Sequence, residues 1–188
     1  MMKIVLQAFG DYGIEYIIGD EIEDLDHLSI VTTGNYYSSV LGLSAGNIEL
    51  YGPLPVSDSP RYLCFLLQFP AKDSTIKDER IRRNQHITTA FWMIFSPTKD
   101  IDLLSKNRTV LNRVLKEKSK KYSVQELRKT TAADIAALKV DLVNKLEQVA
   151  VRQDQTDNLA VQVGKSIVLL EILSRTAKSK QDITFIID

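Results

Sequence analysis

The sequence is poor in the residues that build covalent or metal-bound frameworks. It has one cysteine, Cys64, and two histidines, His27 and His86, among 188 residues. A single cysteine excludes an intrachain disulfide framework and a cysteine-rich metal site, and it favours a reducing compartment. The histidines are far apart in the sequence and lack metal-ligand spacing. We therefore expect a cytoplasmic protein with no bound metal and no cofactor.

Long apolar runs and a net charge are also missing. No stretch approaches the roughly 20 apolar residues that span a bilayer, and the apolar start of the chain breaks at Gln7, short of a signal-peptide core. The 24 basic and 24 acidic residues cancel, so the whole chain has no basic field for nucleic acid or anionic lipid. We expect a soluble protein that binds no nucleic acid and has no integral membrane segment, while peripheral membrane association stays open.

Candidate catalytic groups are scarce. Cys64 lies within an apolar run, where forming a thiolate is costly. Asp24 and Asp26 beside His27 imitate an acid–base group, but a solvated acidic helix start explains them better. No glycine-rich loop carries the lysine and hydroxyl residue that a phosphate site requires. We expect that the protein is not an enzyme.

Charge is distributed unevenly along the chain. Residues 1–60 carry one basic and nine acidic side chains, whereas residues 61–130 carry sixteen basic and seven acidic ones. One interpretation is that the two segments face each other across one fold. The other is a basic surface for an acidic partner, with Arg80, Arg82 and Arg83 as the candidate contacts to an anionic group.

The first 95 residues have the pattern of an antiparallel sheet. Apolar runs at 4–9 and 14–18 flank a Gly-Asp-Tyr-Gly turn, which predicts a hairpin. Further strands are predicted at 48–50, 62–69 and 88–95, and the last two are apolar on both sides of the pleat, as buried strands are.

Helices are predicted around and after these strands. Ile22, Leu25 and Leu28 indicate a helix that begins near Asp20, and a stripe from Tyr36 to Leu41 either continues it or forms a second helix. Residues 72–85 are too polar for a core and are interpreted as a long exposed connection with at most one helical turn. An apolar face over residues 100–121 predicts a third helical segment. Two capping motifs follow, Ser123-x-x-Glu126 and Thr131-x-x-Asp134, and each predicts a helix start.

The last helix is predicted from Ala132 to about Ala177, which is longer than a small sheet can cover. Its apolar positions follow two neighbouring seams that step alternately by three and four, a pattern that suits a bundle of helices. The seam taken as the assembly surface contains Ile135, Leu138, Leu142, Val149, Arg152, Leu159, Val163, Leu170 and Leu173. The alternative is a bend in the polar segment 152–157, which would give a helical hairpin that packs back on the sheet.

A hairpin, a helix, three strands and then helices is the element order of longin domains, and the segment 2–121 resembles them in this respect. The resemblance implies an α+β fold with a small antiparallel sheet and flanking helices, followed by the long helix or hairpin. It divides the chain into a longin-like domain at 1–121, a connector at 122–130 and a helical assembly segment at 131–188. It also implies a trafficking factor or small GTPase as partner.

Residues 142–152 are similar to the first half of an arginine-type SNARE motif. The resemblance implies that Arg152 is a central ionic layer between apolar layers. Lys145, Thr156 and Ser166 depart from it, because they stand where the family has apolar residues, and no lipidated C-terminal cysteine follows. We therefore expect homo-oligomerisation or a SNARE-like bundle through this helix rather than membrane fusion.

Two hypotheses of function remain. The first is a non-enzymatic interaction module, in which the sheet edge and a helix bind a protein partner and the last helix drives assembly. The second is a small-molecule sensor of profilin-like type, in which Tyr36, Tyr37, Trp92 and Phe95 line a pocket and the long helix relays the signal. Ordinary core packing is the competing explanation for these aromatic residues.

Overall fold

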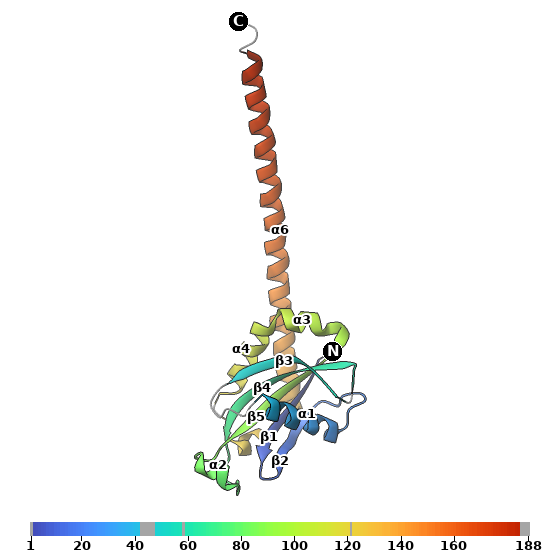
Figure 1. The fold of residues 1–188 in the computed structure, drawn as a ribbon, viewed down its shortest axis with the longest axis vertical. Coiled ribbons are helices and arrows are strands. Elements are labelled where there is room, and N and C mark those ends of the chain that lie inside the picture. Colours follow the sequence, from blue (N-terminus) through green and yellow to red (C-terminus); the bar gives the residue numbers. More distant parts are fainter. Residues whose placement is uncertain (1, 42–47, 58, 121, 185–188) are drawn as a thin grey trace. The chain divides into compact units, whose positions relative to one another are not determined.

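The structure is a computed structural model, in which the strands come first along the chain and most helices last (Figure 1). It describes residues 2–41, 48–57, 59–120 and 122–184, and in the final helix it describes side chains as far as Ile167, except those of residues 153, 154, 157 and 164. The strands are β1 (Lys3–Gly10), β2 (Gly13–Gly19), β3 (Glu49–Pro55), β4 (Tyr62–Lys72) and β5 (Ile87–Pro97). The helices are α1 (His27–Val40), α2 (Glu79–Arg83), α3 (Ile101–Lys106), α4 (Arg108–Lys118), α5 (Val124–Leu127) and α6 (Ala132–Thr184), with a 3-10 turn, η1 (Thr98–Asp100).

Within the described residues the strands form one antiparallel sheet in the order β2-β1-β5-β4-β3. The predicted α+β class, with an antiparallel sheet and flanking helices, is confirmed. The hairpin prediction is also confirmed: Gly10 pairs with Gly13, so Asp11 and Tyr12 form a two-residue loop. Gly13 has a φ of 115°, which side-chain-bearing residues rarely adopt, so the turn requires glycine there.

The central strands β4 and β5 are longer than predicted. They pair from Tyr62 and Pro97 at one end to Lys72 and Ile87 at the other. Side chains on both faces of these strands are buried. Burial on both faces explains why the sequence has an unbroken apolar run here instead of alternation.

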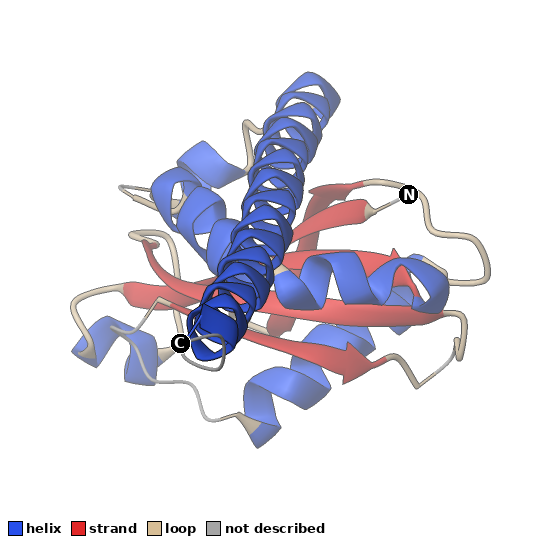
Figure 2. Cartoon of the chain, turned by 90° about the horizontal axis from the view of Figure 1, so that it is seen from above, coloured by secondary structure: helices blue, strands red, loops and turns tan. Residues whose placement is uncertain are grey.

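Different helices cover the two faces of the sheet (Figure 2). Trp92 and Phe95 are three residues apart in β5, so the alternation of a strand places them on opposite faces. Phe95 belongs to a buried cluster with Tyr37 of α1. Trp92 lies beside Leu127 of α5 and Leu138 of α6. Hence α1 covers one face, and α4, α5 and the first turns of α6 cover the other.

The helix predicted to begin near Asp20 begins later, at His27. Asp26 is its N-cap, and its carboxylate accepts a hydrogen bond of 2.7 Å from the backbone N–H of Ser29. Residues 21–25 form a turn instead, with an isolated bridge between Ile22 and Leu25. The prediction was wrong because a turn, and not a helix, brings Ile22 and Leu25 to the same side, where both are buried in the core.

One helix, α1, then contains the whole stripe to Val40, so the two predicted helical stretches are one. Glycine generally weakens helices, yet Gly34 lies inside this one. In the structure a Cβ at Gly34 would lie 2.2 Å from Oε1 of Gln7 in β1. The glycine therefore lets α1 approach the sheet closely.

The helix predicted over residues 100–121 is divided into α3 and α4 at Asn107. The Asn107 side chain donates a hydrogen bond of 2.8 Å to the carbonyl oxygen of Leu103, and its backbone leaves the helical region. The predicted apolar face is nevertheless buried on both sides of this break, at Leu104 and Leu111. The polar connection 72–85 is mostly exposed and contains α2, although Asp73 and Ile76 are buried.

Both predicted capping motifs are confirmed. The N–H and hydroxyl of Ser123 donate to Glu126 Oε2 over 2.9 and 3.2 Å, and α5 follows. The N–H and hydroxyl of Thr131 donate to Asp134 Oδ2 over 2.8 and 2.7 Å at the start of α6. Each carboxylate thus accepts hydrogen bonds at the beginning of its own helix.

The chain divides into two compact units, residues 1–145 and 146–188. The first unit contains the sheet, α1 to α5 and α6 as far as Lys145. The second contains the remaining turns of α6. The beginning of the last helix is therefore part of the folded domain.

Candidate functional site

The first three residues of the predicted assembly surface lie in the core of the first unit. Ile135 and Leu138 are buried, and Leu142 is 0% exposed. Their spacing of three and four places them on one face of α6. This face is already covered within one chain, so it has no apolar area to offer to a partner.

An ion pair fixes the same segment of α6 to the hairpin. Lys139 Nζ donates to both carboxylate oxygens of Asp20, at 2.9 and 3.1 Å. Asp20 also accepts the backbone N–H of Ile4 at 2.8 Å. Both charged side chains are mostly buried, so the pair is better shielded from water than an ordinary surface salt bridge.

The later residues of the predicted surface differ from the first three. Val149 is partly buried, and Arg152 is exposed. Leu159 is 61% and Val163 51% exposed. The side chains of Leu170 and Leu173 lie outside the described residues. Three more apolar residues of α6, which the chosen seam omitted, are also exposed: Val151, Val161 and Ile167.

The arginine cluster lies on α2 and is largely paired within that helix. Arg80 contacts its N-cap Asp78 at 2.8 Å, and Arg83 contacts Glu79 at 3.3 Å. Arg82 is exposed. Two of the three candidate anion contacts are thus partly neutralised by their own neighbours.

Two ion pairs join the acidic first segment to the basic middle segment. Arg61 contacts Asp24 at 2.9 Å, and Arg128 contacts Glu15 at 2.8 Å. These pairs favour the interpretation that the two oppositely charged segments face each other within one fold. Because both pairs are exposed, they contribute little to stability.

The two edges of the sheet differ in their capacity to pair with another strand. At the β3 edge, Pro53 and Pro55 lack an N–H, and Arg108 donates to the carbonyl oxygens of Leu50 and Gly52. At the β2 edge, no described segment of the chain pairs with the outer side of Gly13–Gly19. Within the described residues, β2 is the open edge.

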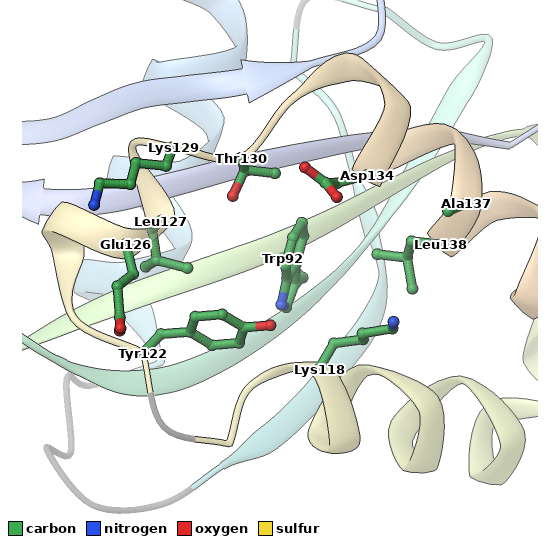
Figure 3. A pocket seen from close by; sticks show the side chains of 10 residues that line it. All are labelled: Trp92, Lys118, Tyr122, Glu126, Leu127, Lys129, Thr130, Asp134, Ala137 and Leu138. Carbon is green, nitrogen blue, oxygen red and sulfur yellow. The ribbon is translucent and has the colours of Figure 1, made fainter.

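The four aromatic residues proposed for a ligand pocket do not surround one cavity. Tyr37 and Phe95 are buried in the cluster beneath α1, and Tyr36 is exposed. Trp92 lies on the opposite face, where it lines a pocket of about 260 Å³ (Figure 3). Core packing, the competing explanation, holds for Tyr37 and Phe95, and Trp92 is separated from Phe95 because residues at odd spacing in a strand point to opposite faces.

The other walls of this pocket come from residues that the sequence analysis did not assign to a ligand site. They include Lys118 at the end of α4, Tyr122 and Lys129 on either side of α5, and Leu138 in α6. These residues are brought together only by packing of several elements on the sheet. The sequence feature closest to the pocket was the capping box at Ser123, because it starts α5, whose Glu126 and Leu127 line the pocket.

The groups considered for catalysis are dispersed. Cys64 is fully buried in β4, and burial raises the pKa of its thiol far above the ordinary value. His27 stacks on Tyr16 with ring centroids 4.3 Å apart. Within the described residues, no group of three or more His, Cys, Asp or Glu side chains is placed to hold a metal ion.

Comparisons with protein-family profiles, curated proteins and solved structures find no match for this chain. None of the helices in the described residues combines the length and apolar character needed to cross a bilayer.

Proposed function

We propose that the protein is a non-enzymatic interaction module, with a longin-like domain at residues 1–145 and a helical continuation that assembles with a second copy of the chain. Support for the longin-like domain comes from its element order, which is a hairpin, a helix, three strands and then helices. The resemblance supplies the class of function, vesicle trafficking, and the class of partner, a small GTPase or another trafficking factor.

Exposed apolar side chains on α6 beyond Lys145 carry this proposal. Leu159, Val163 and Ile167 follow each other at steps of four, and each is more than half exposed. Residues four apart lie on the same face of a helix. Helices in water depend on burial of such a face more than on intrinsic propensity. A 53-residue helix with an uncovered apolar stripe is therefore best explained by a partner that covers it.

The charge pattern of the second unit favours another copy of the same helix in antiparallel orientation. Residues 146–163 carry one basic and three acidic side chains, whereas residues 164–184 carry four basic and two acidic ones. Antiparallel pairing brings the acidic half of one helix beside the basic half of the other. Parallel pairing would place like charges together, which destabilises a helix pair.

The open β2 edge is the proposed docking site for a partner other than a second copy. Partners commonly add a strand to an exposed sheet edge, because main-chain hydrogen bonds supply affinity and alternate side chains supply specificity. The opposite edge is blocked by prolines and by Arg108, as described above. We expect the outward-facing amides of β2 to exchange with deuterium faster than those of β5, and a bound partner to slow them.

The assembly is tested by light scattering on the full chain and on two matched variants. Val163→Lys places a charge on the proposed stripe. Val161→Lys places the same charge two residues away, on another face of the helix, and both valines are exposed, so neither change should affect the domain. We expect a dimer for the unchanged chain and for Val161→Lys, and a monomer for Val163→Lys. A monomer at every concentration, or equal disruption by both variants, would contradict the proposal.

Orientation and the role of Arg152 can be tested on the same dimer. In an antiparallel pair, fluorophores attached through Glu147→Cys and Lys180→Cys on different copies transfer energy efficiently, whereas two labels at Glu147→Cys do not. If Arg152 is a polar layer that fixes the register of the two helices, Arg152→Leu should raise the melting temperature of the dimer. The variant should also form a mixture of oligomers in place of a single dimer. A larger bundle with other SNARE-like helices would show as a heteromeric stoichiometry and would replace the dimer proposal.

A further inference from the structure

The pocket over Trp92 has features of a ligand site that the proposed assembly does not use. Its volume is about 260 Å³, and it is an open depression lined by the sheet, the end of α4, the α5 turn and the first turns of α6. All of its lining residues belong to the first unit. It lies on the face of the sheet opposite α1.

A buried hydrogen-bond donor without a partner faces this pocket. Trp92 is 5% exposed, and its indole Nε1 has no hydrogen-bond partner. Leaving a buried donor unpaired costs about 1–3 kcal/mol, and buried donors are usually satisfied by protein, ordered water or a ligand. Figure 3 shows the nitrogen on the side of the ring that faces the Tyr122 hydroxyl and the Lys118 ammonium. Because the indole nitrogen only donates, a ligand there must offer an acceptor.

Four charged side chains line the pocket, two ammonium groups and two carboxylates. Lys118 and Lys129 line it, and no hydrogen bond or ion pair joins either ammonium to a described residue, although the charge of Lys118 acts on Asp134 and that of Lys129 on Glu126. The two lining carboxylates, Glu126 and Asp134, accept hydrogen bonds within their helix caps instead. Those hydrogen bonds lower the pKa of both carboxyls, so they stay ionised at neutral pH. The two cations and two anions of the lining balance, so the local donors at Trp92 and Lys118, and not a net positive charge, would attract an anion.

The remaining walls are apolar except for the hydroxyl of Thr130. The Trp92 ring, Leu127, Ala137 and Leu138 offer hydrocarbon surface beside the donors. Small-molecule sites combine such a surface with a few polar groups that fix orientation, and their volumes begin near 300 Å³. A small ligand with one acceptor end and an apolar body matches both parts of this pocket.

We propose that this pocket binds a small organic monocarboxylate, with its carboxylate between Trp92 Nε1, the Tyr122 hydroxyl and the Lys118 ammonium, and its apolar body against Leu127 and Leu138. The carboxylate accepts from the indole N–H that the protein leaves unpaired. Binding in the first unit does not require assembly of α6, so it can be tested independently of the proposed function.

The test uses the intrinsic fluorescence of the full chain, because Trp92 is its single tryptophan. The probes are hexanoate, decanoate and benzoate, with hexanamide as an uncharged control for hexanoate and inorganic phosphate as an anion without an apolar body. We expect a saturable change with at least one carboxylate. Hexanamide and phosphate should bind at least about tenfold more weakly than the carboxylate that binds best, because each lacks one of the two required features.

Variants of the lining residues test whether the carboxylate binds in this pocket. Lys118→Gln and Tyr122→Phe should each weaken carboxylate binding about threefold to tenfold, whereas Lys120→Gln, an exposed lysine that does not line the pocket, should leave it unchanged. Trp92→Phe, followed by calorimetry, should weaken binding by a similar factor while retaining a ring at the pocket wall. Failure of all three carboxylates to bind, equal binding of hexanamide or phosphate, or equal effects of Lys118→Gln and Lys120→Gln would each overturn the proposal.

Discussion

The first turns of α6 belong to the domain, so the position of a truncation decides whether the remainder folds. A chain that ends at Lys145 keeps Ile135, Leu138 and Leu142, whereas a chain that ends at Thr130 loses all three buried side chains. Each contributes about 1.5–3 kcal/mol through burial, so their combined loss is about 5–9 kcal/mol. An ordinary domain has a free energy of unfolding of only about 5–15 kcal/mol. The shorter chain also loses the Lys139 partner of Asp20.

Circular dichroism during urea denaturation measures this difference. We expect residues 1–145 to unfold cooperatively as a monomer, and residues 1–130 to show no cooperative transition. In the full chain, Leu142→Ala should lower the free energy of unfolding by about 2–5 kcal/mol, whereas Val140→Ala on the exposed face should change it by about 0.5 kcal/mol or less. Equal midpoints for the two truncated chains, or equal effects of the two alanine variants, would refute the assignment of this segment to the domain core.

Three further predictions concern other parts of the first unit. Lys139→Met should lower the free energy of unfolding by about 1–2 kcal/mol in urea, because it leaves the partly buried Asp20 carboxylate without its cation; no added loss is expected when Asp20→Asn is already present. The pKa values of Glu126 and Asp134 are lowered below the ordinary 4.5 and 3.8 by hydrogen bonds from Ser123 and Thr131, so the stability that they contribute is complete above those values and is lost as the pH falls below them. Melting curves from pH 6 to pH 2 should therefore show a shallower decline for Glu126→Gln and Asp134→Asn, and an unchanged slope would contradict this. The thiol of Cys64 should react with an aromatic disulfide at least about a thousandfold more slowly in the native chain than in urea, because reaction requires unfolding; fast native labelling would show that β4 opens locally.

Signals that act over a few residues were read correctly from the sequence. The Gly-Asp-Tyr-Gly turn predicted the β1–β2 hairpin, and the motifs at Ser123 and Thr131 predicted two helix starts. These motifs are local because the hydrogen bonds that they form join residues three positions apart. The surrounding fold is not needed to identify them.

Errors arose where a distant segment decides the local structure. The sequence left open whether one helix or two cover the residues up to Leu41, and it did not show that Gly34 lies against the end of the Gln7 side chain of β1. The apolar face over residues 100–121 was identified, but the break at Asn107 was not, because the face continues on both sides of it. The aromatic pocket was misplaced because a list of aromatic residues does not say which face of the sheet each one occupies.

The sequence by itself determined the α+β class, the hairpin and the helix caps, because each of these follows from residue spacing within one segment. Only the tertiary structure decided that the first turns of α6 are core, that β2 is the open edge, and that Lys118, Tyr122 and Trp92 share a pocket. Those facts depend on contacts between segments far apart in the chain, and residue spacing within one segment carries no information about them.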